Sequence, residues 1–224
     1  MTQTILPEKK KPKYSKGEEI FNMVTHNVGG ALGIVATVLC VIFAAKHNNV
    51  YGVVSSCIFG ASMIILYTMS SIYHGLSPNL KAKKVFRILD HCSIFLLIAG
   101  TYTPFALCTL RQYDIATGWI IFGIVQAMAI LGIVLNAVNM KKYKTFSFIC
   151  YLVMGWCILA KINLLPKLLG MTGFVLLLSG GIVYTIGAIL YGIGKKKKWM
   201  HSIFHIFIVI GSLLHFLCIL LYVV

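Results

Sequence analysis

The chain has little negative charge: 5 Asp and Glu stand against 20 Lys and Arg in 224 residues. It has no C-x-x-C pair, and its 7 cysteines are an odd number within or beside apolar segments. Neither a disulfide framework nor a thiolate zinc site is therefore indicated, and the cysteines are expected to serve packing. The opening stretch, MTQTILPEKKKPKYSKGEE, has no apolar core, which excludes a cleavable signal peptide.

Long apolar runs, in contrast, make up most of the sequence. Hydrophobic residues account for 59% of the chain and the mean hydropathy is +0.89, well above the roughly 45–50% apolar content of a soluble domain. The runs are continuous and do not alternate as barrel strands do, so they predict membrane helices. Seven spans are expected, at Val24–Ala45, Tyr51–His74, Phe86–Leu110, Ala116–Val138, Thr145–Ile162, Leu168–Tyr191 and Met200–Val224. The predicted fold is an all-α seven-transmembrane helix bundle, residues 19–224, preceded by a basic tail, residues 1–18.

The basic residues predict how the bundle is oriented. Most of the 20 lie in the tail and in the segments that join spans two and three, four and five, and six and seven. The other side of the membrane would carry only Lys46, Arg111, Lys161 and Lys167. The positive-inside rule then places the N-terminus in the cytoplasm and the C-terminus outside the cell. Such short basic loops suit anionic lipid headgroups, so membrane lipids and not nucleic acid are the expected partners.

Ionisable residues are expected to gather at the cytoplasmic level of three spans. His201 and His205 begin the seventh span and share one helix face. His74 and Ser70 end the second span, and Asp90 begins the third. Each alone could be a core or interface residue, but intramembrane ionisable groups usually face the bundle interior and serve function. Their coincidence at one depth predicts a site.

Three histidines in this layer suggest a metal. Three neutral imidazoles with an open fourth position form a typical catalytic zinc site, and His74, His201 and His205 could supply them. Asp90 could hold or deprotonate the bound water, and Ser70 could either donate to a developing oxyanion or bond a metal ligand from behind. Zinc follows from the ligand type, so another ion that prefers imidazole remains open.

Further polar residues are open to two interpretations. Glu19, Asn22 and His26 share one face of the first span, either as second-shell groups around the metal chamber or as helix-capping and interface residues. His91 points about 100° away from the preceding aspartate and is expected to make an interhelical hydrogen bond. His215 lies about 15 Å deeper than the metal histidines and would bond within the core or line a water path.

Helix breakers and small residues add two expectations. Pro104, in TYTPF, is expected to kink the third span and to free backbone groups that could line a cavity. Glycines such as Gly29 and Gly33 should allow close helix packing.

The combination of motifs resembles the hemolysin III family. The motifs are S-x-x-x-H (Ser70, His74), Asp90 at the head of the next span, and H-x-x-x-H (His201, His205), with EEIFNMVTHNVGG and LDHCSIFLLIAGTYTPF around the first and third spans. That family belongs with the progestin and adipoQ receptors, including the adiponectin receptors, and more distantly with the alkaline ceramidases. The resemblance implies a seven-helix bundle with the N-terminus inside and a Zn²⁺ ion on the three histidines. The short tail is similar to the bacterial branch, which implies a multi-pass protein of a bacterial plasma membrane.

Three functions compete on this basis. The first is a zinc-dependent intramembrane hydrolase of lipid amide (ceramide-like) or ester bonds, with Asp90 and Ser70 as catalytic residues and a lipid inside the bundle. The second, from the family name, is a hemolysin-type pore-forming protein with a structural zinc, although no amphipathic pore-lining stripe is evident. The third is a receptor or membrane-stress sensor. A retinal protein fits less well, because the last span has no lysine for a Schiff base. The pattern does not select an oligomeric state.

Overall fold

The computed structural model describes residues 14–193 and 197–224 of the chain. Within these two ranges the regular structure is helical, and seven helices are long and apolar enough to cross a membrane. The prediction of an all-α seven-span membrane bundle is therefore confirmed. The first helix begins at Lys16 and not at Val24, so the end of the predicted tail is already part of the bundle.

The elements follow one another with short connections. In chain order they are α1 (Lys16–Lys46), α2 (Val50–Gly75), α3 (Lys81–Pro104), the π-helical segment η1 (Phe105–Leu110), α4 (Arg111–Tyr113), α5 (Ile115–Asn139), α6 (Lys144–Trp156), the 3₁₀ segment η2 (Cys157–Lys161), α7 (Leu165–Ile193) and α8 (Met200–Tyr222). The third span consists of α3, η1 and α4, and the fifth consists of α6 and η2.

Side-chain caps define where several helices begin. Ser15 and Glu18 form a capping box at α1, in which each side chain bonds the backbone of the other residue. Asn49 accepts a hydrogen bond from the backbone at the start of α2, and Asp114 accepts one from the Thr117 backbone at the start of α5. The bonds from Thr117 lower the pKa of Asp114, because they stabilise the ionised carboxylate that accepts them. These caps satisfy N–H groups that have no partner inside the helix.

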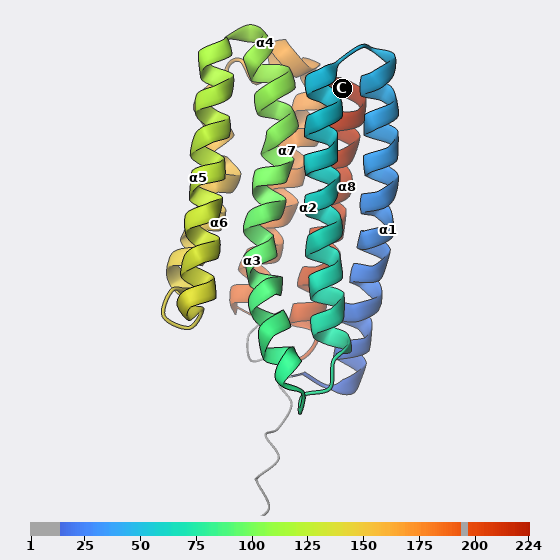
Figure 1. Cartoon of the computed structure of the whole chain (residues 1–224), viewed down its shortest axis with the longest axis vertical. Coiled ribbons are helices and arrows are strands. Elements are labelled where there is room, and N and C mark those ends of the chain that lie inside the picture. The colour runs from blue at the N-terminus through green and yellow to red at the C-terminus, as the bar shows by residue number, and fades with distance from the viewer. Residues whose placement is uncertain (1–13, 194–196) are drawn as a thin grey trace, which may run out of the picture.

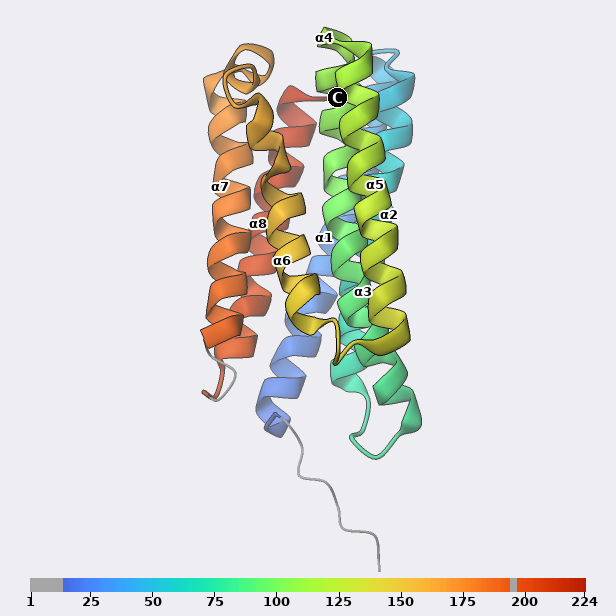
Figure 2. The same cartoon turned by 90° about the vertical axis from the view of Figure 1, so that its left-hand side faces the viewer.

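The spans form one elongated bundle (Figure 1). Helix α1 packs on α2, α2 on α3 and α3 on α5, whereas α8 packs on both α7 and α1. Helix α6 lies between α5 and α7 (Figure 2). The contact between α8 and α1 brings the last span beside the first two, which places the ends of α1 and α2 next to the start of α8.

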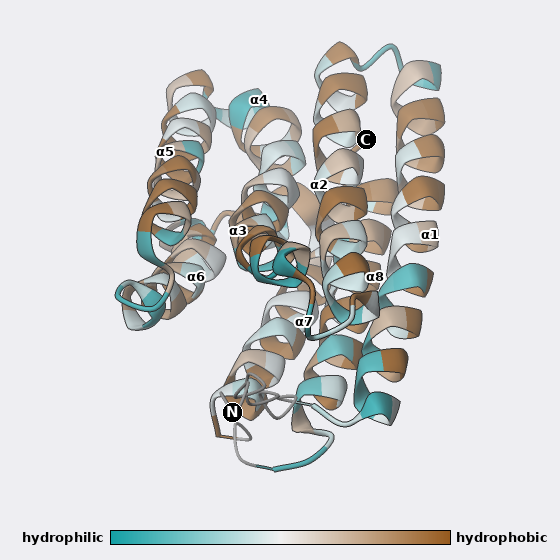
Figure 3. Cartoon of the chain, turned by 60° about the horizontal axis from the view of Figure 1, so that its bottom comes forward, coloured by the Kyte–Doolittle hydropathy of each residue, from teal (hydrophilic) through white to brown (hydrophobic). Residues whose placement is uncertain are grey.

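Hydrophilic residues gather at the end of the bundle where α1 begins (Figure 3). We call it the basic end, because the connections α2–α3 and α5–α6 lie there (Figure 1), with Lys81, Lys83, Lys141 and Lys142 in or beside them. In the predicted basic run 195–198, Lys195 and Lys196 lie outside the described residues. The grouping of basic loops at one end follows from the topology, while the cytoplasmic location of that end remains a prediction.

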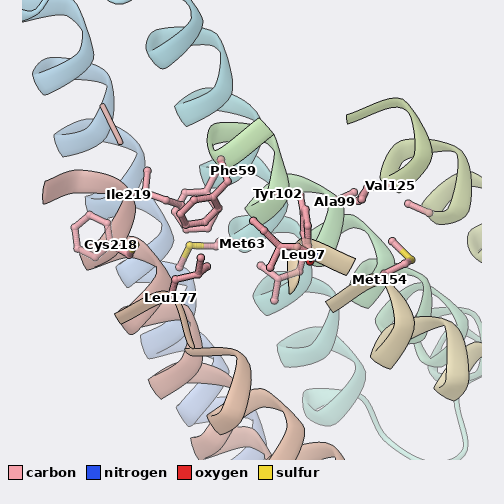
Figure 4. Close-up of a cluster of buried hydrophobic side chains, with 14 of the residues drawn as sticks. Phe59, Met63, Leu97, Ala99, Tyr102, Val125, Met154, Leu177, Cys218 and Ile219 are labelled. Atoms are coloured by element: carbon pink, nitrogen blue, oxygen red, sulfur yellow. Dashed lines mark hydrogen bonds between the residues drawn. The ribbon is translucent and has the colours of Figure 1, made fainter. Parts of the chain in front are cut away.

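Close helix contacts depend on small residues. A Cβ atom at Gly29 would lie 2.5 Å from the Tyr67 ring, and one at Gly33 would lie 3.2 Å from Met63. Met63 and Phe59 of α2 belong to a buried cluster to which α3, α5, α6, α7 and α8 also contribute (Figure 4). Since lipid tails are as apolar as these side chains, tight packing rather than the hydrophobic effect holds the helices together.

The third span changes its winding at Pro104. The chain does not break there but continues as the π-helical segment η1, whose six residues are all buried. Such π segments are rare and occur mostly as single turns inside α-helices, frequently at functional sites. Its first residue, Phe105, lines the cavity described below.

Candidate metal centre

Three histidines meet at the basic end of the bundle. The Nε2 atom of His201 lies 3.3 Å from Nε2 of His74 and 3.1 Å from Nε2 of His205. Ligand atoms of all three side chains lie within 4.8 Å of one another. His74 comes from α2 and the other two from adjacent turns of α8, so the α1–α2–α8 packing creates the cluster. His74 and His205 are only 2% and 1% exposed.

The cluster is compatible with a metal ion. With zinc–nitrogen bonds of about 2.0–2.1 Å, two ligands of a tetrahedral site lie about 3.3–3.4 Å apart. The two short Nε2 separations, 3.3 and 3.1 Å, are close to this value. Three imidazoles also leave one position for water or substrate. The donor set is therefore compatible with zinc or another ion that prefers imidazole.

A carboxylate orients the His74 ring. Oε2 of Glu19 lies 2.6 Å from Nδ1 of His74, and Oε1 of Glu19 accepts a hydrogen bond of 2.8 Å from Lys83. An ionised carboxylate can only accept, so the ring proton belongs on Nδ1 and the Nε2 lone pair points into the cluster. This carboxylate–histidine pair is the usual outer support of a metal ligand.

The other two polar residues of α1 also contact the histidines. The Asn22 side-chain amide lies 3.5 Å from Nδ1 of His74. Its backbone carbonyl lies near the His205 ring without reaching hydrogen-bond geometry. The His26 ring stacks on His205, with centroids 3.7 Å apart and planes inclined by 21°. Glu19, Asn22 and His26 therefore all lie beside the three histidines, and their supporting role at a metal stays a prediction.

Asp90 and Ser70 lie beside the three histidines. The Asp90 carboxylate is close enough to His74 and His205 to interact with them electrostatically. The Ser70 hydroxyl is buried near Asp90, yet it makes no hydrogen bond of ordinary geometry within residues 14–193 and 197–224. The structure thus brings all five residues of the predicted metal and catalytic set together. Their roles stay predictions.

The start of α8 is bound to the start of α1. Oε1 of Glu18 accepts a 2.7 Å hydrogen bond from the backbone N–H of Trp199, which has a left-handed φ of 65° and precedes α8. Phe21 and the Trp199 indole pack edge to face. Because His201 follows two residues later, this contact helps to set its position.

Tyr14 covers the cluster from the basic end. Its ring stacks on His201 with centroids 4.8 Å apart and planes inclined by 9°. Burial raises the pKa of Tyr14 above its ordinary value, so the ring remains a neutral phenol. The sequence interpretation missed Tyr14 and Glu18 because it assigned them to a solvated tail. The pattern Ser15-x-x-Glu18, a capping-box signature, would have indicated that the helix begins earlier.

His91 makes hydrogen bonds both within its helix and to a neighbouring helix. Its Nδ1 atom donates to the backbone carbonyl of Arg87, 2.9 Å away in the same helix, and lies 3.6 Å from the Asp90 carboxylate. The described contacts of the ring thus lie within its own helix, whereas the His91 backbone carbonyl accepts an interhelical hydrogen bond of 2.8 Å from the Tyr151 hydroxyl of α6. A carbonyl four residues earlier on the same helix was already within reach.

A cavity of about 610 Å³, partly open to the outside of the bundle, lies beside the cluster. His201, His205, Ser70 and Asp90 line it at the basic end, and the remaining wall is mostly apolar. The cavity extends to His215, which follows His205 by ten residues on α8 and therefore lies about 15 Å deeper in the bundle. The cavity is large enough for a lipid-sized apolar group.

These features define the class: a multi-pass membrane protein with seven spans and a buried three-histidine cluster beside an apolar cavity. The family described as "Haemolysin-III related" matches residues 14–216. The chain belongs to the haemolysin III family.

Similar proteins agree with this assignment. "Hemolysin-3" of Bacillus cereus is 42% identical over 92% of this chain and 92% of its own length. "Hemolysin-3 homolog" of Bacillus subtilis (strain 168) is 41% identical over 92% of this chain and 95% of its own. "Monocyte to macrophage differentiation factor" of Homo sapiens is 23% identical over 73% of this chain and 68% of its own. The resemblance seen in the sequence is thereby confirmed, together with a multi-pass membrane location.

Proposed function

We propose that this protein is a zinc-dependent intramembrane hydrolase of lipid amide or ester bonds. The observation that carries the proposal is the convergence of three imidazole nitrogens, a carboxylate and a hydroxyl at one end of a mostly apolar cavity. An apolar cavity suits a lipid chain, and its polar end suits the polar bond to be cleaved.

His74, His201 and His205 would hold the ion through Nε2, with Glu19 fixing the His74 ring. When bound, the zinc ion supplies a Lewis acid and lowers the pKa of a coordinated water to about 7.

The chain's own groups would perform the remaining steps. Asp90 would accept the proton of the attacking water, since it lines the same cavity as His201 and His205 and interacts electrostatically with His74. The Ser70 hydroxyl, which has no other bond of ordinary geometry among the described side chains, would donate to the developing oxyanion. The cavity would hold the acyl chain and keep bulk water away from the reacting bond.

The first test is metal content. Protein purified in detergent without chelators is expected to carry about one zinc per chain by mass spectrometry. His74→Ala and the double variant His201→Ala, His205→Ala should each lose it. His47→Ala is the matched control, because His47 ends α1 at the opposite end and is exposed. A wild type without zinc, even after reloading, would contradict the proposal.

The second test is hydrolysis. Zinc-loaded wild type should cleave at least one member of a panel of lipid amides and esters, while Asp90→Asn should keep its zinc and lose about 10²-fold or more in rate. Equal background turnover by both proteins across the panel would refute hydrolase activity and leave a structural metal site.

A pore-forming function has one supporting observation, the name "Hemolysin-3" given to the Bacillus cereus relative. It predicts dye release from liposomes that increases with the amount of protein added. Release that is unchanged in the zinc-free double variant would separate this function from the metal cluster, and no release at any dose would remove it.

A further inference from the structure

The inner end of the cavity is polar, although it lies deep within the bundle. His215 and Tyr184 line the cavity there, about 15 Å along α8 from His205. The Tyr184 hydroxyl lies 2.7 Å from Oγ of Ser212, which also accepts a 2.6 Å hydrogen bond from Tyr67. His215 and Tyr184 thus line the cavity here, and the buried hydroxyls of Ser212 and Tyr67 lie behind Tyr184.

His215 has hydrogen-bonding capacity that the surrounding helices do not use. The residue is only 6% exposed, and no described side chain or backbone group bonds its Nδ1 atom. Aromatic rings flank it, with Tyr184 at 5.2 Å and Phe105 at 6.5 Å between centroids. A buried polar nitrogen without a partner is unfavourable, so a ligand group that formed a hydrogen bond with it would be stabilised there.

Two glycines make room for these rings. A Cβ atom at Gly180 of α7 would lie 2.8 Å from Nε2 of His215, and one at Gly211 of α8 would lie 2.5 Å from the Tyr184 ring. Both distances are too short for any other residue without a shift of the ring. The rings are therefore accommodated by the backbone of the two facing helices.

The hydrogen-bonded hydroxyl groups of Tyr67, Ser212 and Tyr184 can bind a further group. The single Tyr67 proton is shared between Ser212 and the backbone carbonyl of Ile208, at 2.6 and 3.2 Å. The hydroxyls of Tyr184 and Ser212 carry two protons, and their mutual hydrogen bond uses one of them. The other proton can be donated to a further group. With the neutral imidazole of His215, the group can both accept from and donate to a ligand.

The ligand group should be uncharged. The basic side chains that line the described cavity, Arg87, Lys141 and Lys144, all belong to the basic end. A carboxylate or phosphate beside His215 would be buried without a cation to balance it. A hydroxyl group, which donates one hydrogen bond and accepts others, matches the set better.

We propose that His215 and Tyr184 form a subsite for a hydroxyl group carried in the middle of a lipid acyl chain. This inference rests on the proposed function, in which the polar end of the lipid lies at the three histidines. The span between the two polar regions, about 15 Å, selects a chain hydroxylated far from its polar end.

The test compares two fatty acids that differ in one group. Ricinoleate carries a mid-chain hydroxyl and oleate does not. Binding to zinc-loaded protein is measured by native mass spectrometry in detergent. Wild type should bind ricinoleate roughly threefold to tenfold more tightly than oleate, the usual gain from one or two hydrogen bonds.

Two variants assign the preference to the subsite. His215→Leu and Tyr184→Phe should each remove most of it, with zinc content and oleate affinity nearly unchanged. Tyr184→Phe keeps the aromatic ring, so the test remains valid if His215→Leu fails to fold. Ile210→Leu is the control, because Ile210 is an exposed residue on the same helix.

The outcomes separate the two proposals. Equal binding of both fatty acids by wild type, or a preference that survives in both variants, would overturn the subsite and leave the lipid-binding cavity in place. Failure of wild type to bind either fatty acid would overturn the subsite and would also contradict the lipid cavity of the proposed function. Loss of the preference for ricinoleate in both variants, with zinc retained, would support the subsite.

Discussion

The chemistry of single residues at the cluster depends on which nitrogen carries each proton. Glu19 lies 2.6 Å from Nδ1 of His74, which leaves Nε2 as the free lone pair for a metal. Lys83 bonds the second oxygen of the same carboxylate at 2.8 Å. One acidic side chain therefore connects α1 to α2 and to the start of α3.

Replacing Glu19 should weaken the metal site without removing a ligand. Glu19→Gln is expected to lower zinc affinity by about 10–100-fold, or about 1.4–2.7 kcal/mol, as is usual for such supporting groups. Competition with a zinc chelator would measure the change. Lys83→Met, which removes the second contact of Glu19, should have a smaller effect. Affinity unchanged in Glu19→Gln would mean that packing alone orients His74.

Among the helices, contact between the start of α1 and the start of α8 determines the position of His201. Glu18 is 4% exposed and bonds the Trp199 backbone. The capping box with Ser15 holds the Glu18 side chain from the other direction. Two helix starts that are distant in sequence are thus joined by one carboxylate.

Loss of that carboxylate should loosen the first turn of α8. Glu18→Ala is expected to increase hydrogen exchange of the amides around residues 199–205 and to lower zinc affinity severalfold, because His201 loses its support. Ser15→Ala removes the cap, at a cost of about 1 kcal/mol, but retains the bond to Trp199. Exchange mass spectrometry should therefore show protection lost in α8 only for Glu18→Ala, and the same pattern in both variants would contradict this role.

The close packing of α1 on α2 can be tested at Gly29. Gly29→Ala would place a Cβ atom 2.5 Å from the Tyr67 ring, and such overpacking typically costs about 1–3 kcal/mol. The neighbouring Gly30→Ala places its Cβ atom 3.8 Å from Tyr67, an ordinary contact. In thermal unfolding in detergent, Gly29→Ala should have a lower Tm and Gly30→Ala should match wild type. Equal Tm values for the two variants would show that the contact adapts freely.

For the whole molecule, the basic end and the three-histidine cluster coincide. The connections that carry the lysines and the cluster lie at the same end of the bundle. If the positive-inside rule holds, the candidate metal centre faces the cytoplasm.

Reporter fusions test this orientation. A fluorescent protein fused to the N-terminus should be fluorescent, and alkaline phosphatase fused to the C-terminus should be active, because the phosphatase folds only outside the cytoplasm. The reciprocal fusions, phosphatase at the N-terminus and fluorescent protein at the C-terminus, are the controls and should be inactive. The opposite result would place the cluster on the outer side.

Much of this architecture was predictable from the sequence. Apolar runs predict seven spans because a membrane helix must be long and apolar whatever it packs against. The candidate site was predictable from the depth of its residues in the membrane, since His74, Asp90 and His201 lie near the ends of their spans. Helix periodicity also placed His205 on the face of His201.

Contacts between distant residues were decided by the tertiary structure. The sequence shows that Tyr14, Glu18 and His215 exist but not what they touch, because stacking on His201, bonding to Trp199 and lining the cavity depend on how α8 packs against α1 and α7. The sequence by itself therefore determined the class of protein, the spans and the depth of the polar residues. Only the packing of the helices decided that three imidazole nitrogens converge, that Glu19 orients one of them, and that a cavity with a polar inner end lies beside them.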